Sequence, residues 1–110
     1  KVEMMSETPE VAALPPRSTM AVVPTANASR YLQQLCKHWS LKFAVVFDAR
    51  QGHIPLPMGT ADLTAGDMAL TVVCTVTGDG DIDRLQTVVA DHINRFAFRE
   101  PELQFNWQAG

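Results

Sequence analysis

Apolar residues recur with two different periods along this chain, and the order of the two periods limits the folds that the chain can adopt. A period of 3.6 is typical of an amphipathic helix, and a period of two is typical of a half-buried strand. The helical period occurs twice, once before Ser40 and once between Ile82 and Phe96. The first apolar stripe consists of Tyr31, Leu32, Leu35, Cys36 and Trp39. The second consists of Ile82, Leu85, Val88, Val89, His92, Ile93 and Phe96.

Residues that favour helix ends surround both stretches. Thr25 or Asn27 can cap the first helix, and Asp81 can cap the second, because each has a side-chain oxygen that accepts from a free backbone N–H. Pro101 stops the second helix. On the first helix we expect Arg30, Gln33 and Lys37 to face away from the apolar stripe.

The alternating period occurs in six short stretches. They are residues 18–23, 43–47, 53–56, 60–64, 70–76 and 103–107. Turn-forming residues separate them, including a predicted hairpin turn over Asp48–Gly52. The predicted order of elements is therefore β-α-β-β-β-β-α-β.

Short connections between strands, with only two helices, favour an antiparallel sheet. We predict an α+β two-layer sandwich in which both helices cover one face of the sheet. The other face stays open and presents Thr71, Val73, Thr75, Gln104 and Asn106, which form a moderately polar surface for a ligand or a second subunit.

The first 17 residues show neither period, and Pro15 and Pro16 block any short helix there. We predict a flexible tail over residues 1–17 and a single domain over residues 18–110. The net charge of −3 disfavours a partner that is a nucleic acid or an acidic membrane surface. The two cysteines, Cys36 and Cys74, have no metal-ligand spacing and fit buried thiols in a reducing compartment. No apolar run is long enough to span a bilayer, so we expect a cytoplasmic protein.

The three histidines have different predicted environments. His38 lies at the border of the first apolar stripe and is expected to be half exposed, either as a cation that suits the helix C-terminus or as a ligand at the edge of a pocket roofed by Trp39 and Tyr31. His92 lies inside the second stripe. It is either a core residue bonded to a backbone carbonyl or a hydroxyl, or a partner of His38 between the helices. His53 is expected to be a solvated loop residue.

Several cations lie near the predicted C-termini of the two helices. They are Lys37, Lys42, Arg95 and Arg99. One interpretation is that these cations complement the helix dipoles. The other is that the two helix ends are neighbours and the cations form a rim that binds a carboxylate or a phosphate. Two histidines are too few for an ordinary metal site. The chain also contains no nucleophile motif and no glycine-rich phosphate loop, which argues against an enzyme.

Three segments carry a resemblance to a known family. The run from Pro24 to Trp39, and the segments Asp91-His92 and Arg95–Glu100, resemble a bacterial family of short domains of unknown function over residues 18–107. Members of that family occur alone or beside siderophore-interacting, flavin-dependent ferric reductases, so the resemblance implies a link to iron acquisition. The family often has a second histidine three residues after the first, where this chain has Leu41. The element order is also similar to one half of the TATA-binding protein, but the acidic balance of this chain disfavours DNA as its ligand.

The leading interpretation is a small cytoplasmic accessory or binding domain linked to iron or siderophore handling. Its partner would be a small anionic ligand or a siderophore-related protein, and the sequence identifies no cofactor. Two alternatives stay open: an enzyme acting on a small anionic substrate with a histidine as general base, and a structural module that forms a homodimer through the open sheet face. No catalytic or metal-binding residue is assigned. The candidate ligand-binding residues are Tyr31, His38, Trp39, Lys42, His92, Arg95 and Arg99.

Overall fold

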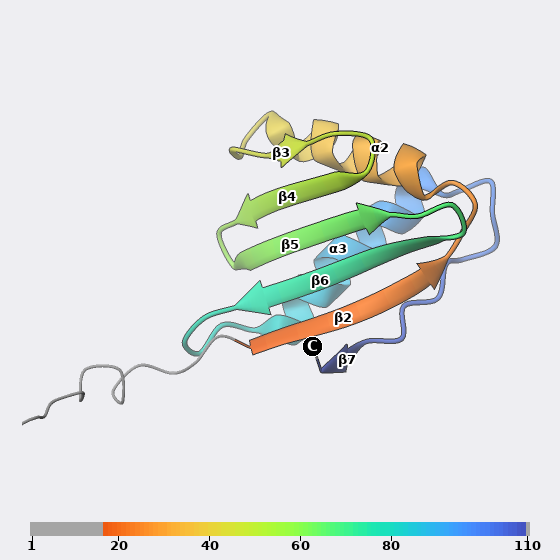
Figure 1. The fold of residues 1–110 in the computed structure, drawn as a ribbon. Coiled ribbons are helices and arrows are strands. Elements are labelled where there is room, and N and C mark those ends of the chain that lie inside the picture. Colours follow the sequence, from red (N-terminus) through yellow and green to blue (C-terminus); the bar gives the residue numbers. More distant parts are fainter. Residues whose placement is uncertain (1–16, 110) are drawn as a thin grey trace, which may run out of the picture.

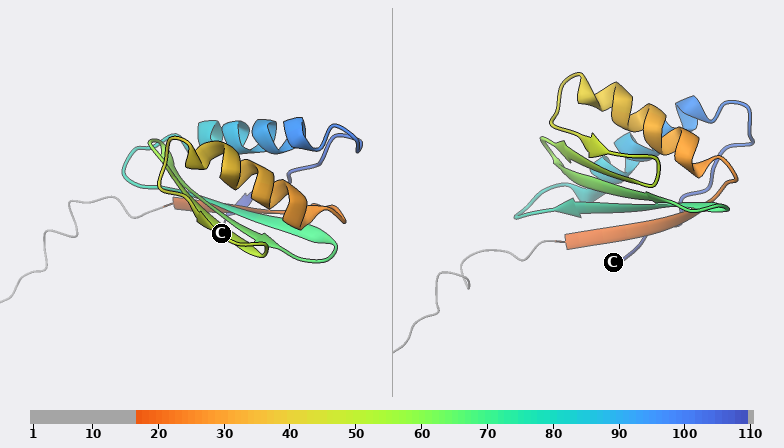
Figure 2. Two further views of the ribbon diagram at one scale, coloured as in Figure 1. Left: turned by 90° about the horizontal axis from the view of Figure 1, so that it is seen from above. Right: turned by 45° about the horizontal axis from the view of Figure 1, so that its top comes forward.

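A six-stranded antiparallel sheet with two helices on one face forms the described part of the protein, residues 17–109 of the computed structural model (Figure 1). The elements are β2 (Arg17–Pro24), α2 (Ala28–Ser40), β3 (Val46–Phe47), β4 (Gln51–Leu56), β5 (Gly59–Ala65), β6 (Ala69–Val76), α3 (Ile82–Phe96) and β7 (Gln108–Ala109). The strands lie in the order β3-β4-β5-β6-β2-β7, and every neighbouring pair is antiparallel. Figure 2 shows both helices in one layer above the sheet. The predicted fold class and element order are confirmed.

Alternation along the strands positions the core. In β6, Leu70, Val72, Cys74 and Val76 are buried while the intervening residues are partly exposed. The helices bury the predicted stripes against these side chains, and the fully buried helical residues include Leu32, Leu35, Leu85 and Ile93. Both cysteines are buried and unpaired, and burial raises the pKa of Cys36 to about 11 and that of Cys74 to about 12. Their thiols are therefore protonated and unreactive near neutral pH.

The helix starts differ in how they are capped. Asp81 caps α3 as predicted, because its Oδ1 accepts from the N–H of Arg84 at 3.0 Å. At α2 the capping residue is Asn27, whose side chain makes no capping bond. Thr25 instead accepts from the N–H of Asn27 at 3.1 Å and so shapes the turn before the helix.

One predicted strand, over residues 43–47, is shorter than expected. After α2, the N–H groups of Lys42 and Phe43 both donate to the carbonyl of Trp39, and these bonds end the helix. Only Val46 and Phe47 then pair with β4. The tail prediction for residues 1–16 lies outside the described residues, but Arg17 is the first residue of β2 rather than the end of the tail.

The predicted C-terminal strand over residues 103–107 is wrong. Leu103 is buried and its N–H donates to Asn94 of α3 at 2.9 Å, while Phe105 and Trp107 pack against the core. Their alternation thus comes from packing against the core and not from a strand ladder. Ladder bonds begin only at β7, which pairs with Thr19 and Met20 of β2. Gln104 and Asn106 are therefore not part of the open sheet face.

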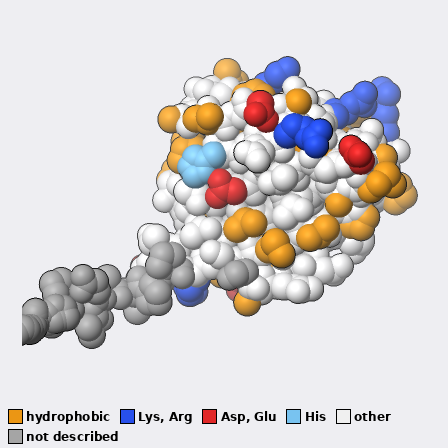
Figure 3. Space-filling model, viewed as in Figure 1, with side chains coloured by type: hydrophobic (Ala, Val, Ile, Leu, Met, Phe, Trp, Pro, Cys, Tyr) orange, Lys and Arg blue, Asp and Glu red, His pale blue; other side chains and the backbone are white. Residues whose placement is uncertain are grey.

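The open face is formed by the outward side chains of five strands, and Figure 3 looks onto it. Its members follow from the strand register, and they are Ser18, Met20, Val22, Pro24, Val46, Gln51, His53, Pro55, Thr60, Asp62, Thr64, Ala69, Thr71, Val73 and Thr75. The prediction that Thr71, Val73 and Thr75 lie on this face is confirmed.

A close approach between β4 and α2 leads to a first prediction. A Cβ atom added at Gly52 would lie 2.6 Å from Sγ of Cys36. We expect Gly52→Ala to lower the free energy of unfolding by about 1–3 kcal/mol through overpacking. In a Cys36→Ala background the same change should cost at least about 1 kcal/mol less, because the clashing sulfur is gone. Urea unfolding of the four proteins of this cycle measures both values, and equal costs in the two backgrounds would show that the contact is not the cause.

Candidate functional site

The two helices are arranged so that the end of α3 meets the beginning of α2 (Figures 1 and 2). The segment after α3, residues 97–107, lies at one end of the helical layer, and the segment after α2, residues 41–45, lies at the other. The last turns of the two helices nevertheless touch through His38 and Phe96, whose ring centres lie 6.2 Å apart. Lys42 and Arg99 follow α2 and α3 respectively, and the anion-binding rim that includes them stays a prediction.

Glu100 ties these two helix ends together. Its Oε2 accepts from the Thr25 hydroxyl at 2.9 Å, from the Asn27 side-chain amide at 3.0 Å and from the Tyr31 hydroxyl. The hydrogen bond from Tyr31, followed by that from Asn27, lowers the pKa of the Glu100 carboxyl. Burial, followed by the bond to Glu100, raises the pKa of Tyr31. At neutral pH the pair thus consists of a carboxylate and a neutral phenol.

A hollow of about 180 Å³ lies beside this junction. Its lining comes from α2 and from the end of α3, and consists of Arg30, Tyr31, Gln34, Phe96, Phe98 and Arg99. The guanidinium carbon of Arg99 lies 5.5 Å from the centre of the exposed Phe98 ring. No carboxylate among residues 17–109 forms an ion pair with either arginine. The hollow therefore combines aromatic walls with two cations that the described chain does not neutralise.

An aromatic cluster joins the two helices, and Phe96 belongs both to this cluster and to the lining of the hollow. The ring centre of His92 lies 4.8 Å from that of Trp39 and 5.6 Å from that of His38, and Phe96 lies 6.2 Å from His38. Nδ1 of His92 is 2.7 Å from the carbonyl oxygen of Val88. Because a carbonyl oxygen only accepts, this nitrogen carries a proton, and Nε2 remains as the second donor or acceptor of the ring.

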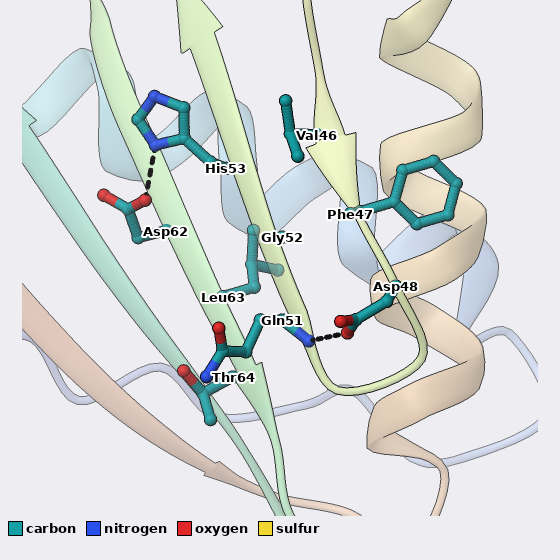
Figure 4. A pocket seen from close by; sticks show the side chains of 9 residues that line it. All are labelled: Val46, Phe47, Asp48, Gln51, Gly52, His53, Asp62, Leu63 and Thr64. Carbon is teal, nitrogen blue, oxygen red and sulfur yellow. Dashed lines mark hydrogen bonds and ion pairs between the residues drawn. The ribbon is translucent and has the colours of Figure 1, made fainter.

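A second hollow, of about 390 Å³, lies at the β3–β4 end of the sheet (Figure 4). His53 and Asp62 project side by side there, with Nδ1 of His53 2.6 Å from Oδ1 of Asp62. His53 is thus a strand residue with a carboxylate partner. The expectation of a loop residue is wrong, but the side chain is exposed to solvent as expected. Asp48 completes the predicted turn by accepting from the N–H groups of Arg50 and Gln51 at 2.8 Å, and these two bonds lower its pKa.

Comparison with known proteins identifies the family. Residues 20–108 match the model of a family described as an uncharacterized protein conserved in bacteria, DUF2218. The chain belongs to this family. The prediction of a bacterial family of unknown function is confirmed to that extent.

A solved structure resembles the chain over most of its length. The chain is similar to PA4090 from Pseudomonas aeruginosa, whose structure was determined by NMR, with 33% sequence identity and a TM-score of 0.65. The similarity covers 84% of this chain and 95% of that one. None of the curated proteins matches the chain. The similarity therefore extends over nearly a whole related domain, but it names no ligand.

The predicted site residues of this DUF2218 domain fall into three groups. His38, Trp39 and His92 meet in the aromatic cluster, while Tyr31 and Arg99 line the hollow beside it. His38 is more exposed and His92 less buried than the sequence suggested. Lys42 belongs to the segment at the opposite end of the helical layer. Arg95 is exposed on α3 and is not among the residues that line the hollow.

Sequence reasoning missed Arg30, Gln34 and Phe98. Arg30 was expected to face away from the core, and it does lie at the surface. It nevertheless lines the hollow, together with Phe96 at the end of α3. Arg30, Gln34 and His38 are spaced four residues apart, so they form one row along α2 beside the apolar stripe. That spacing was the available signal. The spacing indicates a site only once α3 is known to lie next to this row of residues.

Two further observations bear on the class of site. Between residues 17 and 109, no group of three or more His, Cys, Asp or Glu side chains is placed to hold a metal ion. In the same region no helix has the length and apolar character needed to cross a membrane.

Proposed function

We propose that this DUF2218 domain is a cytoplasmic binding module that takes a small anionic aromatic molecule in the hollow between α2 and the end of α3. The observation that carries the proposal is the pair of arginines, Arg30 and Arg99, at a hollow with aromatic walls and no carboxylate neutralising them among residues 17–109. Two unpaired buried thiols support a reducing location.

The chemistry of the lining supports one class of ligand. Guanidinium groups bind carboxylates through two parallel hydrogen bonds, and aromatic faces such as Phe98 stack on planar rings. The hollow of about 180 Å³ is smaller than the sites of about 300–1,000 Å³ that enclose drug-sized molecules. A single ring that carries a carboxylate therefore fits better than a large cofactor.

A role in iron or siderophore handling would agree with this ligand class. The proposal draws here on the resemblance to domains that accompany siderophore-interacting ferric reductases. Aromatic acids with adjacent hydroxyl groups chelate iron and carry the charge that the two arginines favour. A suitable probe is therefore 2,3-dihydroxybenzoate, with 2,3-dihydroxybenzamide as its uncharged counterpart.

The test is an NMR titration of the ¹⁵N-labelled full chain. We expect 2,3-dihydroxybenzoate to shift the amide signals of Arg30, Tyr31 and Arg99, and we expect Arg99→Ala to weaken binding at least tenfold, since a lost charged hydrogen bond is worth about 1.5–3 kcal/mol. Arg84→Ala removes an exposed arginine at the other end of α3 and is the matched control. The proposal would be contradicted if saturating 2,3-dihydroxybenzoate left the amide signals of Arg30, Tyr31 and Arg99 unshifted. Equal affinity of the Arg99→Ala and Arg84→Ala variants for the probe would contradict it too.

Catalysis with His92 as a general base is the second candidate. It is favoured by the bond from Nδ1 of His92 to the Val88 carbonyl, which leaves Nε2 as the basic position next to Trp39. A pH titration of the His92 ring signals by NMR, with and without the probe, separates the two functions. A His92 ring that neither titrates between pH 5 and 8 nor responds to the bound probe is a structural residue, and the enzyme interpretation then fails.

A further inference from the structure

We propose that the open face of the sheet is the contact surface of a symmetric dimer, with a second copy of this chain as its occupant. Charged side chains are nearly absent from the outward strand positions of this face. Of the fifteen outward positions of the open face, only Asp62 is an Asp, Glu, Lys or Arg residue. Protein surfaces in contact with water typically carry about 25–35% of these residues, whereas the centres of protein interfaces are depleted of them.

Apolar side chains occupy the part of this face where charge is missing. Met20 and Val22 of β2 are 38% and 53% exposed, and Val73 lies opposite Met20 on the neighbouring β6. In Figure 3 hydrophobic side chains form a row on one half of the face, while a histidine and an acidic side chain lie together on the other half. A second apolar surface covering Val22 and its neighbours would remove this row from water.

The one carboxylate of the face does not oppose its burial. Asp62 already has a partner in His53, with 2.6 Å between Nδ1 and Oδ1. A carboxylate with a hydrogen-bonded partner tolerates partial desolvation far better than an isolated one.

The size of the face matches a modest interface. β2 and β6 have eight residues each, β5 has seven and β4 has six. With about 3.3 Å per residue and about 4.8 Å between strands, the face measures about 25 by 20 Å. That is the scale of the smaller specific interfaces, which are typical of partners that associate reversibly. A nucleic acid is a poor alternative occupant because none of the fifteen outward strand positions is Lys or Arg, and the cations visible in Figure 3 lie away from the apolar row.

Sedimentation equilibrium of the full chain from about 5 µM to 1 mM tests the proposal. We expect a monomer–dimer equilibrium that Val22→Glu and, separately, Met20→Glu weaken at least tenfold, because each would bury an unpaired carboxylate in both copies. Leu41→Glu is the matched control. Leu41 is an equally apolar and more exposed residue, at 83%, but it follows α2 in the helical layer.

NMR of a mixed sample supplies a readout that does not depend on a variant. With one half of the chains isotope-labelled, methyl contacts between labelled and unlabelled copies should involve Val22 and Val73. A chain that stays monomeric to 1 mM would overturn the proposal, as would a dimer whose intermolecular contacts lie on the helical layer. A dimer that Leu41→Glu weakens as much as Val22→Glu does would overturn it too.

Discussion

Replacing Gly59 with alanine is expected to lower the free energy of unfolding by about 3–5 kcal/mol, although the change adds only one methyl group. Gly59 opens β5 directly after the Pro57-Met58 turn, and its φ is +153°. An alanine there would occupy a conformation that L-residues rarely adopt, at a cost of about 1–3 kcal/mol. Its Cβ would also lie 2.5 Å from the carbonyl oxygen of Thr75 and 2.9 Å from Leu85, which adds about 1–3 kcal/mol of overpacking.

Two other glycines separate these causes. Gly78 has a φ of +59°, and an added Cβ would meet no atom within 4 Å, so Gly78→Ala should cost only about 1–2 kcal/mol. At Gly66 the nearest atom is the Ala69 carbonyl oxygen at 3.4 Å, and φ is not in the left-handed region, so the change should be within about 0.5 kcal/mol of zero. Chemical denaturation at one temperature ranks the three. If Gly59→Ala were no worse than Gly78→Ala, steric crowding at the turn would contribute nothing.

Replacing Glu100 with alanine is expected to lower the free energy of unfolding by about 2–3 kcal/mol. The change removes the common acceptor of Thr25, Asn27 and Tyr31, and it leaves the buried Thr25 hydroxyl and the Tyr31 hydroxyl without this partner. The loss is moderated because part of the carboxylate is open to water. Glu102→Ala, two residues further along the exposed segment, is the control and should be close to neutral.

The contribution of Glu100 should depend on pH. Its pKa in the folded protein lies below the ordinary value of 4.5, so the carboxylate stabilises the fold above that pH and loses this effect as the pH falls through the folded pKa. The pKa of Tyr31 is shifted in the opposite direction, so its contribution to stability depends on pH in the opposite way. Its pKa lies above 10.0, so its contribution is complete below pH 10 and is lost as the pH rises through the folded pKa. The stability difference between the wild type and Glu100→Gln should therefore narrow from pH 7 to pH 3, and a constant difference would show that the charge of Glu100 plays no part.

The sequence predicted those parts of the fold in which local pattern and long-range contact agree. The buried stripe of α2 and the alternation of β6 each reflect one face packed on one core, so periodicity was enough. It failed at residues 103–107, where Leu103, Phe105 and Trp107 alternate because they pack against the core without a ladder partner. Period two shows which side chains point inward, but it does not show whether a neighbouring strand is present.

The candidate site required information that no local pattern contains. The convergence of His38 with His92, and the junction between Tyr31 and Glu100, depend on the direction in which α3 crosses α2. That direction follows from the number and order of the strands between the helices. Lys42 and Arg99 both belong near helix C-termini in the sequence, yet Lys42 does not line the hollow, whereas Arg30 and Arg99 line it together.

The position of β2 in the sheet constrains the order in which the protein can assemble. β2 is the first described strand, yet it lies between β6 and β7, and Thr19 pairs with Cys74 on one side and with Ala109 on the other. During synthesis, β2 emerges from the ribosome well before either partner exists. The meander from β4 to β6 can form from neighbouring segments, but β2 must wait with its apolar residues unpaired until most of the chain is complete.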